Sequence, residues 1–182
     1  MKWKTINGLL VTILLGLGVS VYADLPNVVY ILADDLGFGD VHALNPESTI
    51  PTPNMDRLAA EGMTFTDAHS GSAVCTPTRY ALLTGRYAWR TRMRSGVLWT
   101  NDRLLIEPGR DTLASLFQRH GYETACIGKW HLGLGAYDPK DPKGKSDHCL
   151  AADAGPHTVG FGYSLIIPSS LDIPPYLFLE NG

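Results

Sequence analysis

Residues 27–33, from Asn27 to Ala33, form a continuous run of apolar and β-branched side chains that is as long as a β-strand. A run of this kind, without polar alternation, is typical of a strand buried on both faces of a parallel sheet. It predicts a fold in which helices cover the sheet, because only a covered sheet buries both of its faces. Asp34 and Asp35 follow directly and begin a loop rich in glycine and aspartate.

The rest of the chain alternates helical and strand-like segments. Apolar spacing, capping residues and stop glycines predict helices at residues 52–62, 76–85 and 111–120. In the second of these helices, Thr76 is the expected cap and Pro77 the first helical residue. Strand-like runs lie at 63–68 and 122–128, residues 161–167 are apolar again, and 135–156 has the composition of a long surface loop. This order predicts an α/β fold, with a mostly parallel central sheet and helices on both faces.

Polar side chains gather where ligands usually bind in such folds. In α/β sheets, ligands bind beyond the carboxyl ends of the strands. Asp34 and Asp35 follow the first predicted strand, Lys129 and His131 follow the strand at 122–128, and Cys75 stands at a helix N-terminus. The pattern alone therefore predicts one site at this edge of the sheet.

Asp34 and Asp35 are carboxylates next to a buried strand, so their negative charge needs a partner. A hard divalent cation with oxygen ligands supplies one, and Ca²⁺ or Mg²⁺ fits better than Zn²⁺. The alternative is a polar turn in which the two carboxylates cap the next element.

Cys75 and Arg79 lie one helical turn apart, on the same side of a helix. The helix N-terminus favours a nucleophilic thiolate, and an arginine this close suits an anion held by two hydrogen bonds. Lys129 and His131 alternate at a strand end and so face one side, where a lysine offers positive charge and a histidine can carry a proton. The alternatives are a structural cysteine at Cys75 and surface positions for Lys129 and His131.

The N-terminus has the pattern of a signal peptide. Lys2 and Lys4 precede an apolar stretch at residues 8–21, and small residues flank Tyr22 before a cleavage site after Ala23. An uncleaved membrane anchor is the alternative, but the apolar stretch is shorter than the roughly 20 residues that span a bilayer. We therefore expect residues 1–23 to be removed and residues 24–182 to form an exported protein, periplasmic or secreted, without a stable membrane anchor.

The net charge limits the partners that the protein can bind, and the number of cysteines limits the disulfides that it can form. The chain of 182 residues carries a formal net charge of −3, which argues against nucleic-acid binding because that needs a basic surface. Its cysteines are Cys75, Cys126 and Cys149, and an odd number leaves at least one thiol unpaired in an oxidising compartment. Cys126 lies in an apolar run and is expected to be a buried strand residue, whereas the state of Cys149 stays open.

Several motifs together resemble the sulfatase family, within the alkaline-phosphatase-like superfamily. Residues 75–79, Cys-Thr-Pro-Thr-Arg, match the sulfatase signature Cys-x-Pro-x-Arg. Residues 27–37 resemble the family's first strand and metal loop, residues 51–62 match as well, and residues 128–133, Gly-Lys-Trp-His-Leu-Gly, resemble its second signature. The resemblance covers roughly residues 26–182, and the shared order and spacing of these motifs make it specific.

The resemblance implies a chemistry for Cys75. In sulfatases a separate maturation enzyme, which reads Cys-x-Pro-x-Arg, oxidises this cysteine to formylglycine, an aldehyde. Its hydrate offers two hydroxyls on one carbon: one attacks sulfur and displaces the alcohol, and the other then releases sulfate as the aldehyde re-forms. A thiol or a simple alcohol lacks the second hydroxyl and would stop at the covalent intermediate.

The resemblance also assigns roles residue by residue. Asp34 and Asp35 would bind Ca²⁺ together with the modified Cys75, with Mg²⁺ as the alternative ion. Arg79 would hold the formylglycine hydrate. The other implied roles are Lys129 on the sulfate oxygens, His131 on the hydrate and its proton, and Ser170, or else Ser169, on the substrate sulfate.

Family members are longer than this chain, and their remaining metal ligands, an Asp-Asn pair, come from later sequence together with a further histidine and lysine. We therefore expect an N-terminal portion of a sulfatase that is inactive alone. The alternatives are a phosphate or phosphonate ester hydrolase of the same superfamily and a non-catalytic module that binds anions or carbohydrates. The resemblance implies a sulfated small molecule or glycan as the substrate. An arginine-rich stretch suits a sulfated glycan or, equally, a solvated basic face; its members are Arg86, Arg90, Arg92, Arg94, Arg103 and Arg110.

Overall fold

The computed structural model describes residues 25–135, 140, 153–174 and 176–181. The predicted signal peptide, most of the predicted loop at 135–156 and Cys149 lie outside the described residues. The chain divides into two units, the first ending at Asp35 and the second beginning at Leu36, and each is described by itself. Within the described ranges, no helix has both the length and the apolar composition needed to cross a membrane.

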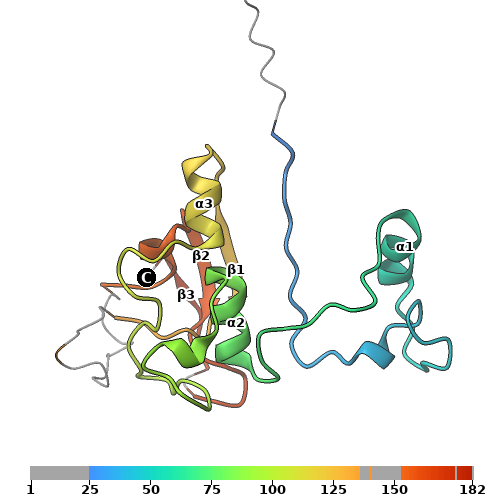
Figure 1. The fold of residues 1–182 in the computed structure, drawn as a ribbon, viewed down its shortest axis with the longest axis horizontal. Helices are drawn as coiled ribbons and strands as arrows, with labels where there is room; N and C mark the ends of the chain where they lie inside the picture. Colours follow the sequence, from blue (N-terminus) through green and yellow to red (C-terminus); the bar gives the residue numbers. More distant parts are fainter. Residues whose placement is uncertain (1–24, 136–139, 141–152, 175, 182) are drawn as a thin grey trace, which may run out of the picture. The chain divides into compact units, whose positions relative to one another are not determined.

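The regular elements all belong to the second unit (Figure 1). In chain order they are η1 (Phe38–Asp40), α1 (Pro53–Glu61), α2 (Cys75–Thr84), η2 (Ala88–Arg90), α3 (Leu113–Arg119), β1 (Ala125–Lys129), η3 (Pro156–Val159), β2 (Tyr163–Ile167) and β3 (Leu179–Glu180).

The sheet is small and mixed. Its strand order is β1-β2-β3, with β1 and β2 parallel and β2 and β3 antiparallel. The parallel pairing matches Ala125 with Tyr163 and Lys129 with Ile167, so both strands end at the same edge. The predicted α/β class is confirmed. The short antiparallel β3 was not predicted, because two residues give no periodic pattern to read.

The three predicted helices are present, because each carries its own start and stop signals. Helix α1 has Pro53 in its first position and ends at Gly62, and α3 is capped by Thr112, whose side chain accepts a hydrogen bond from the backbone N–H of Ser115 at 3.0 Å. Helix α2 ends at Gly85, which has the left-handed φ of 64°. The predicted cap of α2 was wrong: the helix begins at Cys75, after an extended Val74, and Thr76 is already inside it.

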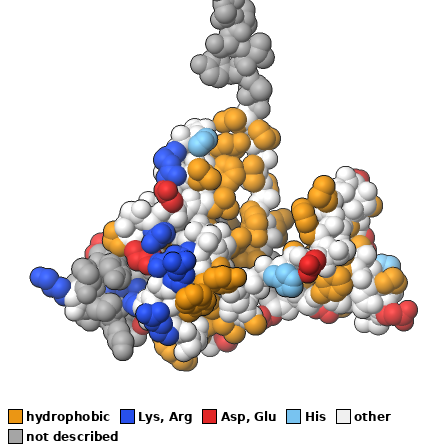
Figure 2. Space-filling view, in the orientation of Figure 1, with side chains coloured by type: hydrophobic (Ala, Val, Ile, Leu, Met, Phe, Trp, Pro, Cys, Tyr) orange, Lys and Arg blue, Asp and Glu red, His pale blue; other side chains and the backbone are white. Residues whose placement is uncertain are grey.

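Two predicted strands were wrong. Residues 27–33 and 63–68 are irregular, and their apolar side chains are exposed, as at Val29 (82%), Ile31 (83%) and Met63 (78%). Figure 2 shows the hydrophobic side chains of the extended segment in the first unit. An apolar run becomes a strand only when a neighbouring strand pairs with its backbone, and neither segment joins a ladder with the described residues. The residues of an apolar run do not show which other segment, if any, will pair with it.

The core of the second unit forms around the segment that follows β1. Trp130, Leu132 and Leu134 are at most 2% exposed and pack in one cluster with Tyr80 of α2 and Leu105. The segment is held along its length by residues 102–105: the N–H of Leu105 donates to the carbonyl of Leu132 at 2.9 Å, and the N–H of Leu134 donates to that of Asp102 at 3.1 Å. The segment that follows β1 is therefore buried and held in place by hydrogen bonds.

We expect Gly133→Ala to lower the free energy of unfolding by about 3 kcal/mol or more, and Gly109→Ala by about 1–2 kcal/mol. Both glycines have a left-handed φ, 80° and 73°, but a Cβ on Gly133 would lie 2.3 Å from the carbonyl oxygen of Arg103, whereas one on Gly109 meets nothing within 4 Å. Urea unfolding followed by tryptophan fluorescence, to which the buried Trp130 contributes, measures both losses. Equal losses for the two variants would contradict the close packing at Gly133.

Candidate functional site

Helix α2 carries the sulfatase-like signature and is bonded to the end of β1. Cys75, half-buried, is its first residue, and Arg79 lies four residues later. A guanidinium N–H of Arg79 donates to the backbone carbonyl of Lys129 at 2.6 Å. The structure therefore brings the predicted pair in the helix next to the predicted cationic end of the strand.

Thr76 makes a second connection between these elements. Its side chain is fully buried, and its hydroxyl donates to the backbone carbonyl of His131 at 3.0 Å. The same oxygen accepts a hydrogen bond from the backbone N–H of Leu98 at 3.2 Å. Sequence reasoning treated Thr76 as a helix cap and missed this role, because both partners are distant along the chain.

His131 is fixed by both its backbone and its ring. It has a left-handed φ of 52°, its N–H donates to the carbonyl of Pro168 at 3.0 Å, and its side chain is buried. Ring atom Nε2 lies 2.8 Å from the carbonyl oxygen of Leu98. Because a carbonyl can only accept, Nε2 carries the proton in the neutral ring, and Nδ1 is left as an acceptor. Nδ1 is buried and has no hydrogen-bond partner among the residues that the structure describes.

The surroundings of His131 favour the neutral ring. Burial lowers its pKa below the ordinary value, and the positive charges of Lys129 and Arg79 lower it further. The hydrogen bond to Leu98 and the charge of Asp172 act in the opposite direction but are smaller than burial. The ring is therefore a proton acceptor at neutral pH, with Nδ1 as the accepting atom.

The loop after β2 contributes Ser169, Ser170 and Asp172. Both serines are buried, whereas Asp172 is exposed. A hydrogen bond from the Ser170 side chain lowers the pKa of Asp172, and backbone hydrogen bonding and the charge of Lys129 add to this. Asp172 was missed by sequence reasoning, although its position two residues after Ser170 in a loop at a strand end was a usable signal.

Asp34 and Asp35 end the first unit, so the structure does not relate them to the cluster around Cys75. Both are exposed, and Asp35 has a left-handed φ of 57°. Two adjacent carboxylates fit Ca²⁺ in the kind of donor, but Ca²⁺ takes 6–8 oxygen ligands. Within the described ranges, no three or more His, Cys, Asp or Glu side chains are grouped so that they could hold a metal ion. The predicted metal site stays a prediction.

Cys126 is a structural cysteine. It lies in β1 and packs against the core, and burial raises the pKa of its thiol to about 11, with Arg79 opposing the rise. A thiol with this pKa is protonated at neutral pH and is a poor nucleophile. Neither Cys75 nor Cys126 is bonded to another cysteine in the described part of the chain. The prediction that Cys126 is a strand residue is confirmed, but its side chain is half-buried and not fully buried.

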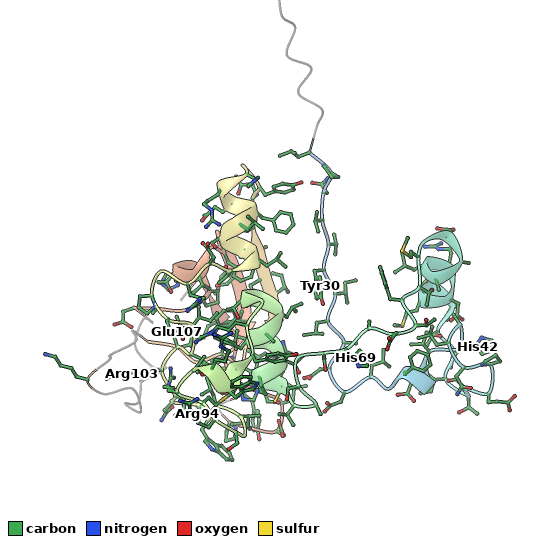
Figure 3. All side chains as sticks on the ribbon, in the orientation of Figure 1. Tyr30, His42, His69, Arg94, Arg103 and Glu107 are labelled. Carbon is green, nitrogen blue, oxygen red and sulfur yellow. The ribbon has the colours of Figure 1, made fainter. Side chains whose placement is uncertain are left out.

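Several members of the arginine-rich stretch bond to other parts of the second unit. Arg86 pairs with Glu107 at 2.7 Å and also reaches the hydroxyl of Tyr80 at 3.3 Å. Tyr80 donates in turn to Glu107 at 2.9 Å, so this group ties α2 to the loop that carries Glu107, which Figure 3 labels. Arg92 and Arg94 donate to backbone carbonyls. Arg86 and Arg92 are half-buried, whereas Arg94 is exposed.

Comparison with known proteins agrees with the motifs. A family model described as Sulfatase matches residues 26–160. The N-acetylgalactosamine-6-O-sulfatase of Bacteroides thetaiotaomicron is 41% identical over 157 residues, which are 86% of this chain and 29% of that protein. Arylsulfatase A of Homo sapiens is 43% identical over 170 residues, which are 93% of this chain and 30% of that protein.

Solved structures give the same result. A structure from work on the metabolism of multiple glycosaminoglycans by Bacteroides thetaiotaomicron matches with a TM-score of 0.77 and 42% identity, over 86% of this chain and 31% of that one. The crystal structure of Ps i-CgsB matches with a TM-score of 0.60 and 28% identity, over 77% and 27% of the two chains. The chain thus spans less than a third of the length of these relatives. With the family model matching most of its length, the chain belongs to the sulfatase family.

Proposed function

We propose that the protein containing this chain hydrolyses sulfate esters, with a formylglycine made from Cys75 as its nucleophile. One observation carries the proposal: Arg79, in the same helix as Cys75, donates at 2.6 Å to the carbonyl of Lys129. The modifiable residue and the cationic end of β1 are thereby held in one piece. Family membership supplies the reaction class.

Each side chain of the cluster has a task in this proposal. The modified Cys75 supplies two hydroxyls on one carbon once it is hydrated. Arg79 and Lys129 would supply two positive charges, and fixed positive charge stabilises the negative charge that develops on a transferring sulfuryl group. His131 offers Nδ1 as the atom that accepts a proton, because Nε2 is occupied by the carbonyl of Leu98.

Ser170 fits the role of a sulfate contact only if its hydroxyl leaves its present partner. In the structure that hydroxyl is bonded to Asp172, an acceptor that a bound sulfate oxygen would replace. Ser169 is almost completely buried, at 1% exposure, and is the less accessible of the two. We therefore keep Ser170 as the substrate-binding residue.

Asp34 and Asp35 would supply two carboxylates to a Ca²⁺ ion, with Mg²⁺ as the alternative, and the modified Cys75 would add a further oxygen. Bound there, the cation would draw negative charge from the sulfate oxygens. The remaining oxygen ligands would come from parts of the protein outside the described residues.

The named relatives support a proposal for the class of substrate. One named relative acts on a 6-O-sulfate of N-acetylgalactosamine, and others are arylsulfatases. We propose a sulfated carbohydrate or an aryl sulfate as substrate, and a formylglycine-generating enzyme as the maturation partner. We further propose export through the signal peptide at residues 1–23, to the periplasm or the outside of the cell, without a membrane anchor or nucleic-acid binding.

The test is an assay of the matured full-length protein on paired aryl sulfate and aryl phosphate substrates, followed by sulfated monosaccharides. We expect kcat/KM to be at least about 100-fold higher for the sulfate of each pair, a difference of about 2.7 kcal/mol in transition-state binding. A preference for phosphate would replace the proposal with phosphate-ester hydrolysis. Tight binding of sulfated glycan without turnover would replace it with a non-catalytic binding module.

A further inference from the structure

We infer that Thr76 is a positioning residue for the proposed reaction: its hydroxyl closes a ring of hydrogen bonds that orients His131 against the helix of Cys75. The inference rests on the proposed function for its kinetic consequence. The orientation of His131 that the inference describes rests only on three hydrogen bonds of the structure.

The ring joins three segments that are far apart in the sequence. The Thr76 hydroxyl donates to the carbonyl of His131 at 3.0 Å, and the His131 ring atom Nε2 donates to the carbonyl of Leu98 at 2.8 Å. The backbone N–H of Leu98 donates back to the Thr76 hydroxyl at 3.2 Å and closes the ring. All three residues are at most 5% exposed, so water does not compete for these bonds.

Only a hydroxyl can occupy the place of Thr76 in this ring. It must donate to one backbone group and accept from another at a single atom, which serine and threonine side chains do and valine does not. Without it, the N–H of Leu98 and the carbonyl of His131 would be buried unpaired. Leu98 would then lose its hydrogen bond to α2. Its carbonyl oxygen, which selects the tautomer of His131, would change position as a result.

The position of Thr76 next to Cys75 makes the ring relevant to the chemistry. The hydroxyl fixes the first turn of α2 and the left-handed backbone of His131, with its φ of 52°, to the same atom. A reacting group and its proton acceptor must keep their separation closely, since a misplacement of about 1 Å can cost about 100-fold in rate. The side chain of Thr76 needs no contact with substrate for this effect.

The experiment compares Thr76→Val and Thr76→Ser with Thr91→Val in the matured full-length protein. Thr91 is a matched control, because it is also buried and its hydroxyl also makes two backbone bonds, donating to Ala88 at 2.7 Å and accepting from Met93 at 3.0 Å. Because Thr76 lies inside the maturation signature, the formylglycine content of each variant is measured by mass spectrometry and kcat is expressed per modified site. Thr76→Ala replaces Thr76→Val if the latter does not fold.

We expect Thr76→Val to lower kcat by about 30- to 100-fold, with KM changed by less than about threefold. Thr76→Ser should restore most of kcat. The kcat of Thr91→Val should stay within about threefold of that of the unsubstituted protein. Nitrogen-15 NMR of the His131 ring should show a neutral ring with its proton on Nε2 in the unsubstituted protein. In Thr76→Val it should show a mixture of the two neutral tautomers, with the proton on Nε2 in some molecules and on Nδ1 in others. A kcat loss no larger than that of Thr91→Val, an unchanged ring spectrum, or a failure of Thr76→Ser to restore kcat would each overturn the inference. If the unsubstituted protein has no turnover, the proposed function fails, and the ring spectra alone decide the role of Thr76.

Discussion

Replacing Cys75 with serine is expected to lower sulfatase turnover of the matured protein by about 10⁴-fold or more. A serine hydroxyl can attack sulfur once, but it has no second hydroxyl on the same carbon to release the sulfate, so the enzyme would stop after one event. The assay is steady-state turnover of an activated aryl sulfate, after co-expression with a maturation enzyme that does not act on serine.

Mass spectrometry of the peptide containing Cys75 tests directly whether this cysteine is modified. Conversion of the thiol to an aldehyde should lower the peptide mass by about 18 Da, whereas the ordinary oxidations of a cysteine add mass. Cys126→Ser is the matched control, because Cys126 is half-buried in β1 with a protonated thiol, and this variant should keep both the mass change and most of the turnover. A thiol at Cys75 that stays unmodified in an active enzyme would contradict the prediction.

The helices could be predicted from the sequence because their signals are local. Pro53 and Gly62 bound α1, and Thr112 caps α3, so a few neighbouring residues contain the information. The strand-like runs at 27–33 and 63–68 contained no such information, since pairing depends on a partner elsewhere. The same apolar pattern predicted a strand at 122–128, and the structure has one at 125–129, where residues 163–167 provide the pairing backbone.

The candidate site, like the fold, could be predicted only where the signals in the sequence are local. Cys75 and Arg79 were related by the helical period, and Lys129 and His131 were placed together at a strand end. The strand reasoning did not hold through His131, because β1 ends at Lys129 and His131 turns into a left-handed conformation. Its direction is set by Thr76, Leu98 and Pro168, which are tertiary partners that periodicity cannot reveal.

Asp35→Asn is expected to weaken Ca²⁺ binding to the matured full-length protein by about 100-fold and to lower kcat accordingly at limiting Ca²⁺. Asparagine keeps one oxygen ligand but removes the negative charge, and ligand charge is what tunes Ca²⁺ affinity. Titration calorimetry measures the affinity without any need for turnover. Removing the ion with a chelator should abolish turnover in the unsubstituted protein, and added Ca²⁺ should restore it.

Asp67→Asn serves as the control for this experiment. The side chain of Asp67 is 92% exposed and pairs with His69, so the variant removes one negative charge from the surface without touching the predicted site. Comparable losses in both variants would mean that Ca²⁺ responds only to net charge. Unchanged Ca²⁺ affinity in Asp35→Asn would contradict a metal role for the Asp34–Asp35 pair and would favour the alternative, a polar turn in which these carboxylates bond to backbone groups.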